Sequence, residues 1–135
     1  MTIKNLLFRF LLVYAGLMIV AWLLLVLLRF ENFIGLDAAM LFGAITVVCT
    51  KFAKKNGRFF TNEEKRQVVF GMLGIDLVIQ FFLLLLPLLL PNAKGIPPGP
   101  LLVMLAIVGV LHLMVIFIFV TLEKRFLIKQ GIIEG

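Results

Sequence analysis

Residues 10–28, FLLVYAGLMIVAWLLLVLL, form an uninterrupted apolar stretch without an acidic or basic side chain. The stretch is 19 residues long, close to the roughly 20 residues that an α-helix needs to cross a hydrocarbon core of about 30 Å. A secretory signal peptide has a shorter apolar region, of roughly 7–15 residues, followed by a small-residue cleavage site. The stretch therefore predicts a transmembrane helix that is retained in the mature protein.

The composition of the whole chain also indicates a membrane protein. Of the 135 residues, 63% are apolar and 15% are charged, against roughly 45–50% and 25% in soluble domains. So few polar side chains cannot cover a water-facing surface. A single Cys excludes an intramolecular disulfide, and no Cys/His cluster has the spacing of a zinc site.

Two further stretches are long enough to span a membrane. Residues 67–93 contain Asp76 as their only charge, and residues 100–122 contain His112 as their only titratable group. A third stretch, residues 38–50, gives only about 20 Å of helix and is too short by itself. It reaches spanning length only if Asp37 lies at the outer membrane interface.

The distribution of Lys and Arg decides whether this short stretch spans. Eleven of the 13 basic residues lie before the first span, between the second and third spans, or after the fourth, and the other two are Arg29 and Lys94. Because Lys and Arg favour the cytoplasmic side, an even number of crossings must separate the first two groups. We therefore predict an all-α bundle of four transmembrane helices, in two antiparallel hairpins, with both termini in the cytoplasm.

We expect a single integral membrane domain over residues 1–135. It contains a cytoplasmic loop at residues 53–66 and an amphipathic tail at residues 123–135, which lies on the inner leaflet or docks a partner. The predicted spans are approximately residues 6–29, 34–52, 67–90 and 100–122.

The connections carry helix start and stop signals. Gly57 suits the end of the second helix, because a C-cap often needs the left-handed conformation. Thr61 and Glu64 form a capping box, so the third helix should begin near Asn62. Pro87 should kink the end of that helix, and the turn-forming sequence that follows it includes residues 92–99.

Asp76 is the strongest candidate for a functional residue. A charged side chain near the bilayer centre costs roughly 2.5–3.5 kcal/mol and calls for a partner or a function. Gln80 lies one turn further along the same helical face, and His112 should lie at a matching depth on the fourth span. With Tyr14 of the first span, these residues predict a buried polar cluster.

This predicted cluster allows two interpretations. Hydrogen bonds between helices, each worth typically about 0.6 kcal/mol and at most about 1.7 kcal/mol, can simply hold the bundle together. An Asp–His pair in a low dielectric can instead bind and release protons near neutral pH. No second acidic residue occurs in a predicted membrane core, which weakens an interpretation as a transport pathway.

The loop between the second and third spans is basic and carries interleaved Phe side chains. Membrane topology and attraction to anionic lipid, worth about 1 kcal/mol per basic residue, account for this composition without nucleic acid. The residues expected to contact anionic lipids are Lys51, Lys54, Lys55, Arg58, Lys65 and Arg66. Small residues should let helices approach closely, within the chain or between copies; they are Ala39, Gly43, Gly71, Gly74, Ala106 and Gly109.

The sequence contains no recognisable catalytic set. It has one His, no Ser, a lone Cys49 and no Gly-rich phosphate loop, so nucleophilic, nucleotide-dependent and metal-dependent catalysis are all unexpected. We expect a protein that is not an enzyme and uses no cofactor.

Residues 51–66, KFAKKNGRFFTNEEKR, resemble a loop of an uncharacterised family of small four-helix inner-membrane proteins from Gram-negative bacteria. In that family the loop reads approximately as aromatic, basic, Asn/His-Gly-Arg, Thr/Ser, then Glu-Lys/Arg. Outside this loop the resemblance is one of hydropathy alone. The resemblance implies the fold, the inner membrane and the topology, and it implies no activity.

Two classes of function remain. The first is a non-enzymatic protein that binds another membrane component, for example an immunity or accessory protein for a pore-forming toxin, which needs a recognisable shape and no chemistry. The second is a small channel, transporter or transporter subunit that uses Asp76 and His112. The single acid in the predicted membrane core favours the first class.

Overall fold

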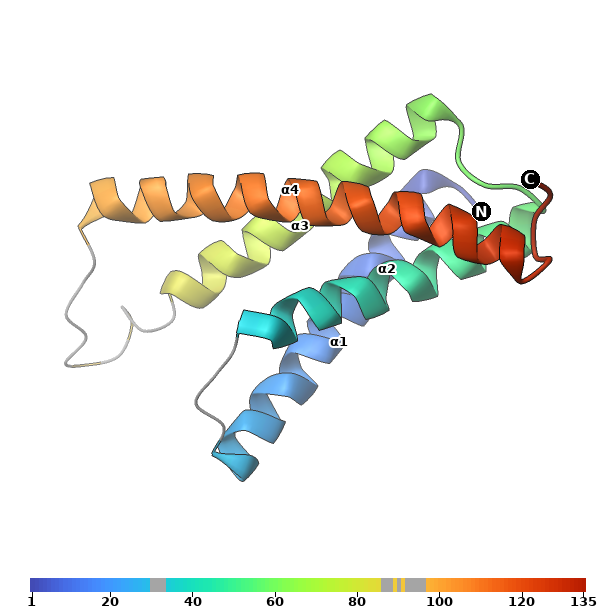
Figure 1. Ribbon diagram of the computed structural model, residues 1–135. Coiled ribbons are helices and arrows are strands. Elements are labelled where there is room, and N and C mark those ends of the chain that lie inside the picture. The colour runs from blue at the N-terminus through green and yellow to red at the C-terminus, as the bar shows by residue number, and fades with distance from the viewer. Residues whose placement is uncertain (30–33, 86–88, 90, 92–96) are drawn as a thin grey trace.

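The computed structural model describes residues 1–29, 34–85, 89, 91 and 97–135 and consists of four helices (Figure 1). All four are long and apolar enough to cross a membrane, and the described residues contain no strand. The prediction of an all-α, four-helix membrane protein is confirmed. The helices are α1 (Ile3–Leu28), α2 (Ile34–Asn56), α3 (Asn62–Leu85) and α4 (Pro98–Lys129).

Each helix contacts two others, so that the four form a closed ring of contacts. Helix α1 packs against α2 and α3, and α4 packs against the same two helices. Consecutive helices run in opposite directions, and both termini lie at the same end of the molecule (Figure 1). At the opposite end, the α1–α2 pair and the α3–α4 pair diverge (Figure 1).

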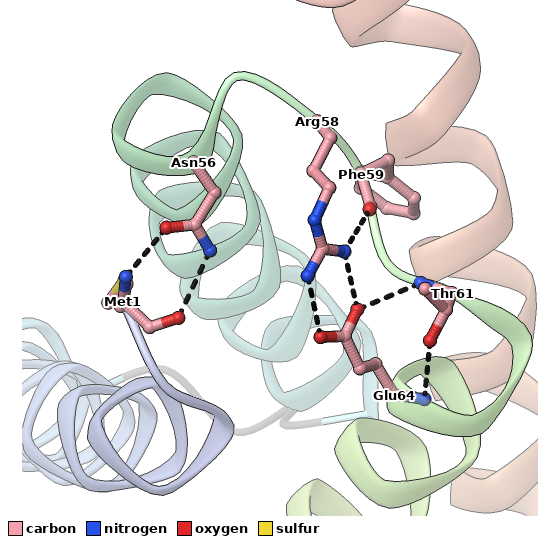
Figure 2. A network of polar contacts seen from close by, with 6 residues as sticks. All are labelled: Met1, Asn56, Arg58, Phe59, Thr61 and Glu64. Carbon is pink, nitrogen blue, oxygen red and sulfur yellow. Dashed lines mark hydrogen bonds and ion pairs between the residues drawn. The ribbon is translucent and has the colours of Figure 1, made fainter.

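The boundary between α2 and α3 follows the local signals in the sequence. Gly57 has a φ of 67°, the left-handed conformation in which glycine avoids the clash of a Cβ atom. The Glu64 amide donates to the Thr61 hydroxyl over 3.3 Å, and the Thr61 amide donates to the Glu64 carboxylate over 2.9 Å (Figure 2). The predicted capping box and the start of α3 at Asn62 are therefore confirmed.

Two side chains of the same region add to this boundary. Arg58 donates from both terminal nitrogens to the Glu64 carboxylate, over 2.7 and 2.9 Å (Figure 2). The Asn56 side-chain amide donates to the backbone carbonyl of Met1 over 3.0 Å. These contacts join the start of α1, the end of α2 and the start of α3 at the end of the molecule that holds the termini.

Helix α4 is longer than the sequence analysis predicts. It continues to Lys129, so a separate amphipathic tail does not begin at residue 123. Glu123 and Leu127 extend the buried face of α4 that includes Ile116 and Val120. The spacing of three or four residues keeps this face against the bundle, and burial of Leu127 outweighs its placement on a lipid surface.

Some predictions concern residues outside the described part of the chain. These are the kink at Pro87, the outer position of Lys94, the turn over residues 92–96 and the end of the third span at residue 90.

Candidate functional site

All four helices contribute to one polar cluster. It consists of Tyr14 from α1, Asp37 from α2, Asp76 and Gln80 from α3, and His112 from α4. Four of these residues are the ones that the sequence predicted to meet, and the fifth, Asp37, is an addition. We refer to these five residues as the polar cluster.

The Tyr14 hydroxyl connects two of the acids. It lies 2.7 Å from Oδ1 of Asp76 and 3.0 Å from Oδ1 of Asp37. Tyr14 and Asp76 are both fully buried, and the Tyr14 ring stacks on Phe10 with the ring centres 5.5 Å apart. A buried polar group needs a hydrogen-bond partner. Here the Tyr14 hydroxyl donates to the Asp76 carboxyl group, so both are satisfied.

The His112 ring lies between the same two acids. Its Nδ1 contacts Oδ2 of Asp76, and its Nε2 lies 3.3 Å from Oδ2 of Asp37. The Gln80 amide nitrogen lies 3.1 Å from His112 Nδ1 and 3.4 Å from Oδ1 of Asp76. The imidazole therefore bridges an acid of each helix pair.

The contacts of His112 require an additional proton. A neutral imidazole carries one N–H and one bare nitrogen, yet both ring nitrogens face carboxylate oxygens. A bare nitrogen cannot pair with an ionised carboxylate, because both are acceptors. The contacts to the two acids can be satisfied when the ring is doubly protonated or one carboxyl is protonated, and either state has one proton that the three groups can share.

Two expectations about depth, Asp37 at the outer interface and Asp76 near the bilayer centre, cannot both hold. Asp37 and Asp76 contact the same hydroxyl, so Asp37 cannot lie at the outer interface while Asp76 lies near mid-depth. Tyr14 is 15 residues before Arg29, about 22 Å of helix, whereas Asp37 is only three residues after Ile34. Helix α2 thus begins well short of the level that α1 reaches, and no feature of local sequence encodes this offset.

Sequence reasoning also missed a second buried acid. Glu123 is 3% exposed and accepts hydrogen bonds from Thr46 over 3.2 Å and from Thr50 over 3.1 Å. The pair of threonines one turn apart on α2 was the available signal, because hydroxyls inside a membrane bundle seek partners on neighbouring helices.

The six basic residues predicted to contact lipid lie near the α2–α3 boundary. Five of them are exposed: Lys51, Lys54, Lys55, Arg58 and Arg66. The hydrogen bonds that Arg58 donates to the Glu64 carboxylate raise the pKa of the Arg58 guanidinium. Lys65 instead turns toward α4, where its ammonium donates to the Thr121 hydroxyl over 2.8 Å and lies 4.4 Å from the centre of the Phe117 ring.

The small residues divide into two groups. A Cβ atom at Gly71 would lie 2.5 Å from Leu7 of α1, and one at Gly109 would lie 3.3 Å from Leu77 of α3. Gly43 has a looser neighbour, since a Cβ atom there would lie 3.8 Å from Leu17. These glycines let helices within the chain approach closely, whereas Ala39, Gly74 and Ala106 are exposed.

The fold defines a multi-pass membrane protein, since all four helices have the length and hydropathy of membrane spans. Comparison of the chain with protein-family models, curated proteins and solved structures found no match.

Proposed function

We propose that this protein is a small transporter or transporter subunit of the bacterial inner membrane, and that its polar cluster binds and releases protons. The observation that supports this proposal most directly is the position of the His112 ring between the carboxyl groups of Asp37 and Asp76. Proton handling needs groups that titrate and lie within hydrogen-bond reach of one another. Asp37, His112 and Asp76 have ionisable side chains and lie within this reach.

This proposal reverses the preference drawn from the sequence alone. The main objection to transport was a single acid in the membrane core, which leaves no relay. Asp37 supplies the second acid, 3.3 Å from the imidazole, and removes that objection. If the cluster only held the helices together, Asp76 and His112 could form the hydrogen bond between α3 and α4 without a third ionisable side chain.

We propose that both termini lie in the cytoplasm. The common position of the termini at one end of the molecule (Figure 1) and the basic residues near the α2–α3 boundary support this orientation, because Lys and Arg favour the cytoplasmic side. The exposed members of that basic group are then suited to contact anionic lipid headgroups.

Proton flux through the reconstituted protein tests the transport proposal. The protein is inserted into phosphatidylethanolamine and phosphatidylglycerol liposomes that contain a pH-sensitive dye, and a potassium diffusion potential drives protons inward. We expect proton uptake above that of empty liposomes. Asp76→Asn and His112→Gln should each reduce uptake to the empty-liposome level, because each removes a group of the shared-proton system.

Glu63→Gln is the matched control, because Glu63 is an exposed acid at the start of α3. This variant should transport like the wild type. Wild-type liposomes indistinguishable from empty ones, or an Asp76→Asn variant with full uptake, would contradict the proposal.

Binding of another membrane component, such as an inserting pore-former or a second copy, is the second candidate. It is favoured by the exposed small residues Ala39 and Gly74, since no neighbouring atom lies within 4 Å of a Cβ placed at Gly74. Gly74→Leu should then abolish protection against the pore-former while Asp76→Asn leaves it intact. The transport proposal expects the opposite ranking of these two variants for proton uptake.

A further inference from the structure

The polar cluster lies between a fully buried layer of the bundle and a part whose described residues are more exposed. Toward the end with the termini, the core residues one helical turn from the cluster, Leu41, Met72 and Ile116, are fully buried. Toward the opposite end, α3 has no buried residue after Asp76 and α4 has none before Gly109, whereas α1 keeps Ala21 and Leu25 buried. The cluster therefore lies at the level where the closed half of the bundle begins.

Exposure within the cluster follows the same direction. The Asp76 side chain is 0% exposed, that of His112 is 15% exposed and that of Asp37 is 32% exposed. An ionised carboxylate is costly in hydrocarbon, and such groups normally face a protein interior or a water-filled cavity. The exposed part of Asp37 therefore requires water, and the buried apolar layer excludes water from the side of the termini.

We infer that Asp37 exchanges protons with water on the side of the membrane opposite the two termini, because among the described residues of the cluster it has the most exposed acid side chain. This inference rests on the proposed transport function. It adds the direction of access and assigns Asp37 as the first residue on the proton path. It also implies that access from the side of the termini requires a second arrangement of the two helix pairs.

The geometry supports a specific transfer through the His112 ring. Asp37 in its protonated form passes its proton to Nε2, and the proton on Nδ1 passes to Oδ2 of Asp76. One proton enters the ring and one leaves it, so the imidazole stays neutral and changes tautomer. Asp37 ends as a carboxylate that can take up another proton from water, and Asp76 ends protonated.

The titratable groups that face this path come from all four helices. They are Tyr14 of α1, Asp37 of α2, Asp76 of α3 and His112 of α4. Among the described residues, no Lys or Arg forms an ion pair with any of them. The number of protons bound along the path should therefore follow the pH of the water that contacts Asp37.

Labelling of introduced cysteines measures this access directly. Asp37→Cys and Gln80→Cys are placed separately in proteoliposomes, and a membrane-impermeant thiosulfonate is added to one side. The orientation of the protein is determined with a Gly135→Cys variant. Both cysteines should react from the side opposite residue 135, at least about tenfold faster than a cysteine in lipid, because only a thiol in contact with water ionises.

Two lipid-facing positions are matched controls. Val20 of α1 is 53% exposed and Val110 of α4 is 60% exposed, and both lie within two turns of the cluster along the helix. Val20→Cys and Val110→Cys should react slowly from either side. The native Cys49 is fully buried and should stay unlabelled in the wild-type protein.

Labelling of Asp37→Cys and Gln80→Cys from the side of residue 135, or from neither side, would overturn the inference. If Asp37→Cys does not elute as a single species in gel filtration, Gln80→Cys carries the test, because Gln80 lies 3.5 Å from Asp37. If the wild type takes up protons but neither cysteine is labelled from the side opposite residue 135, only this inference is contradicted. If the cysteines are labelled from that side but the wild type takes up no protons, the transport proposal is contradicted instead.

Discussion

The carboxylate of Asp37, in the first turn of α2, lies 3.3 Å from Nε2 of His112 in α4. The two residues are 75 positions apart and belong to different helix pairs, which diverge toward one end of the molecule (Figure 1). A contact between them therefore depends on how the two pairs pack. Protonation at this contact can in turn influence that packing, which links proton binding to the shape of the bundle.

Removal of the Tyr14 hydroxyl tests the energetic role of the polar cluster. Tyr14→Phe should lower the free energy of unfolding by about 0.6 to 1.7 kcal/mol, the range of hydrogen bonds inside membrane proteins. Unfolding in mixed micelles measures this difference. Trp22→Phe, at a residue that is 60% exposed, is the control and should change stability by less. Equal effects of the two changes would argue against a stabilising hydroxyl.

Two glycines of α3 provide a matched test of helix packing. Gly71→Ala should destabilise the protein by about 1 kcal/mol, because the new methyl group overlaps Leu7 and forces that side chain to move. Gly74→Ala has no neighbouring atom within 4 Å and should be neutral, or stabilising by about 0.4–1 kcal/mol. Thermal unfolding in detergent compares them. The reverse order would contradict the packing of α1 on α3.

The capping box at the start of α3 gives a third prediction. Thr61→Ala should cost about 1 kcal/mol of stability, because the Glu64 amide loses its hydrogen-bond acceptor. Thr61→Ser retains a hydroxyl and should restore most of the loss. Chemical unfolding of the three proteins under one set of conditions checks this, and an equally unstable Thr61→Ser variant would rule out the cap as the cause.

Glu123 distinguishes a continuous α4 from a surface tail. Glu123→Ala should cost about 1 to 3 kcal/mol, because it leaves the partly buried Thr46 and Thr50 hydroxyls without their partner. Glu123→Gln retains one acceptor oxygen and should cost less than half as much. Glu134→Ala, at an exposed acid, is the control. Unchanged stability of the Glu123→Ala variant would instead indicate that Glu123 lies in a tail on the lipid surface.

The proposed orientation in the membrane is tested independently of function. Reporter fusions after residue 58 and after residue 135 should both be active only with a cytoplasmic reporter, because the basic residues nearby favour that side. A fusion at residue 94 should be active only with a periplasmic reporter. Periplasmic activity at residue 58 would contradict four spans with cytoplasmic termini.

The sequence by itself determined the number of spanning helices and several of their ends. Backbone groups in lipid must bond within a helix, so a long apolar run has one stable conformation. The start of α3 is equally local, because Thr61 and Glu64 are three residues apart. The meeting of Asp76 with His112 could also be predicted, since it follows from comparable depths on adjacent spans.

Only the tertiary structure decided the roles of Asp37 and Glu123. Asp37 looked like the outer end of a span, yet its partners are Tyr14, 23 residues earlier, and His112. Glu123 looked like the start of a surface tail, yet its partner Thr50 is 73 residues away. Hydropathy shows which segments are apolar enough to enter the lipid bilayer. It does not record the axial offset between helices, which is set by how side chains of different helices interlock when they pack.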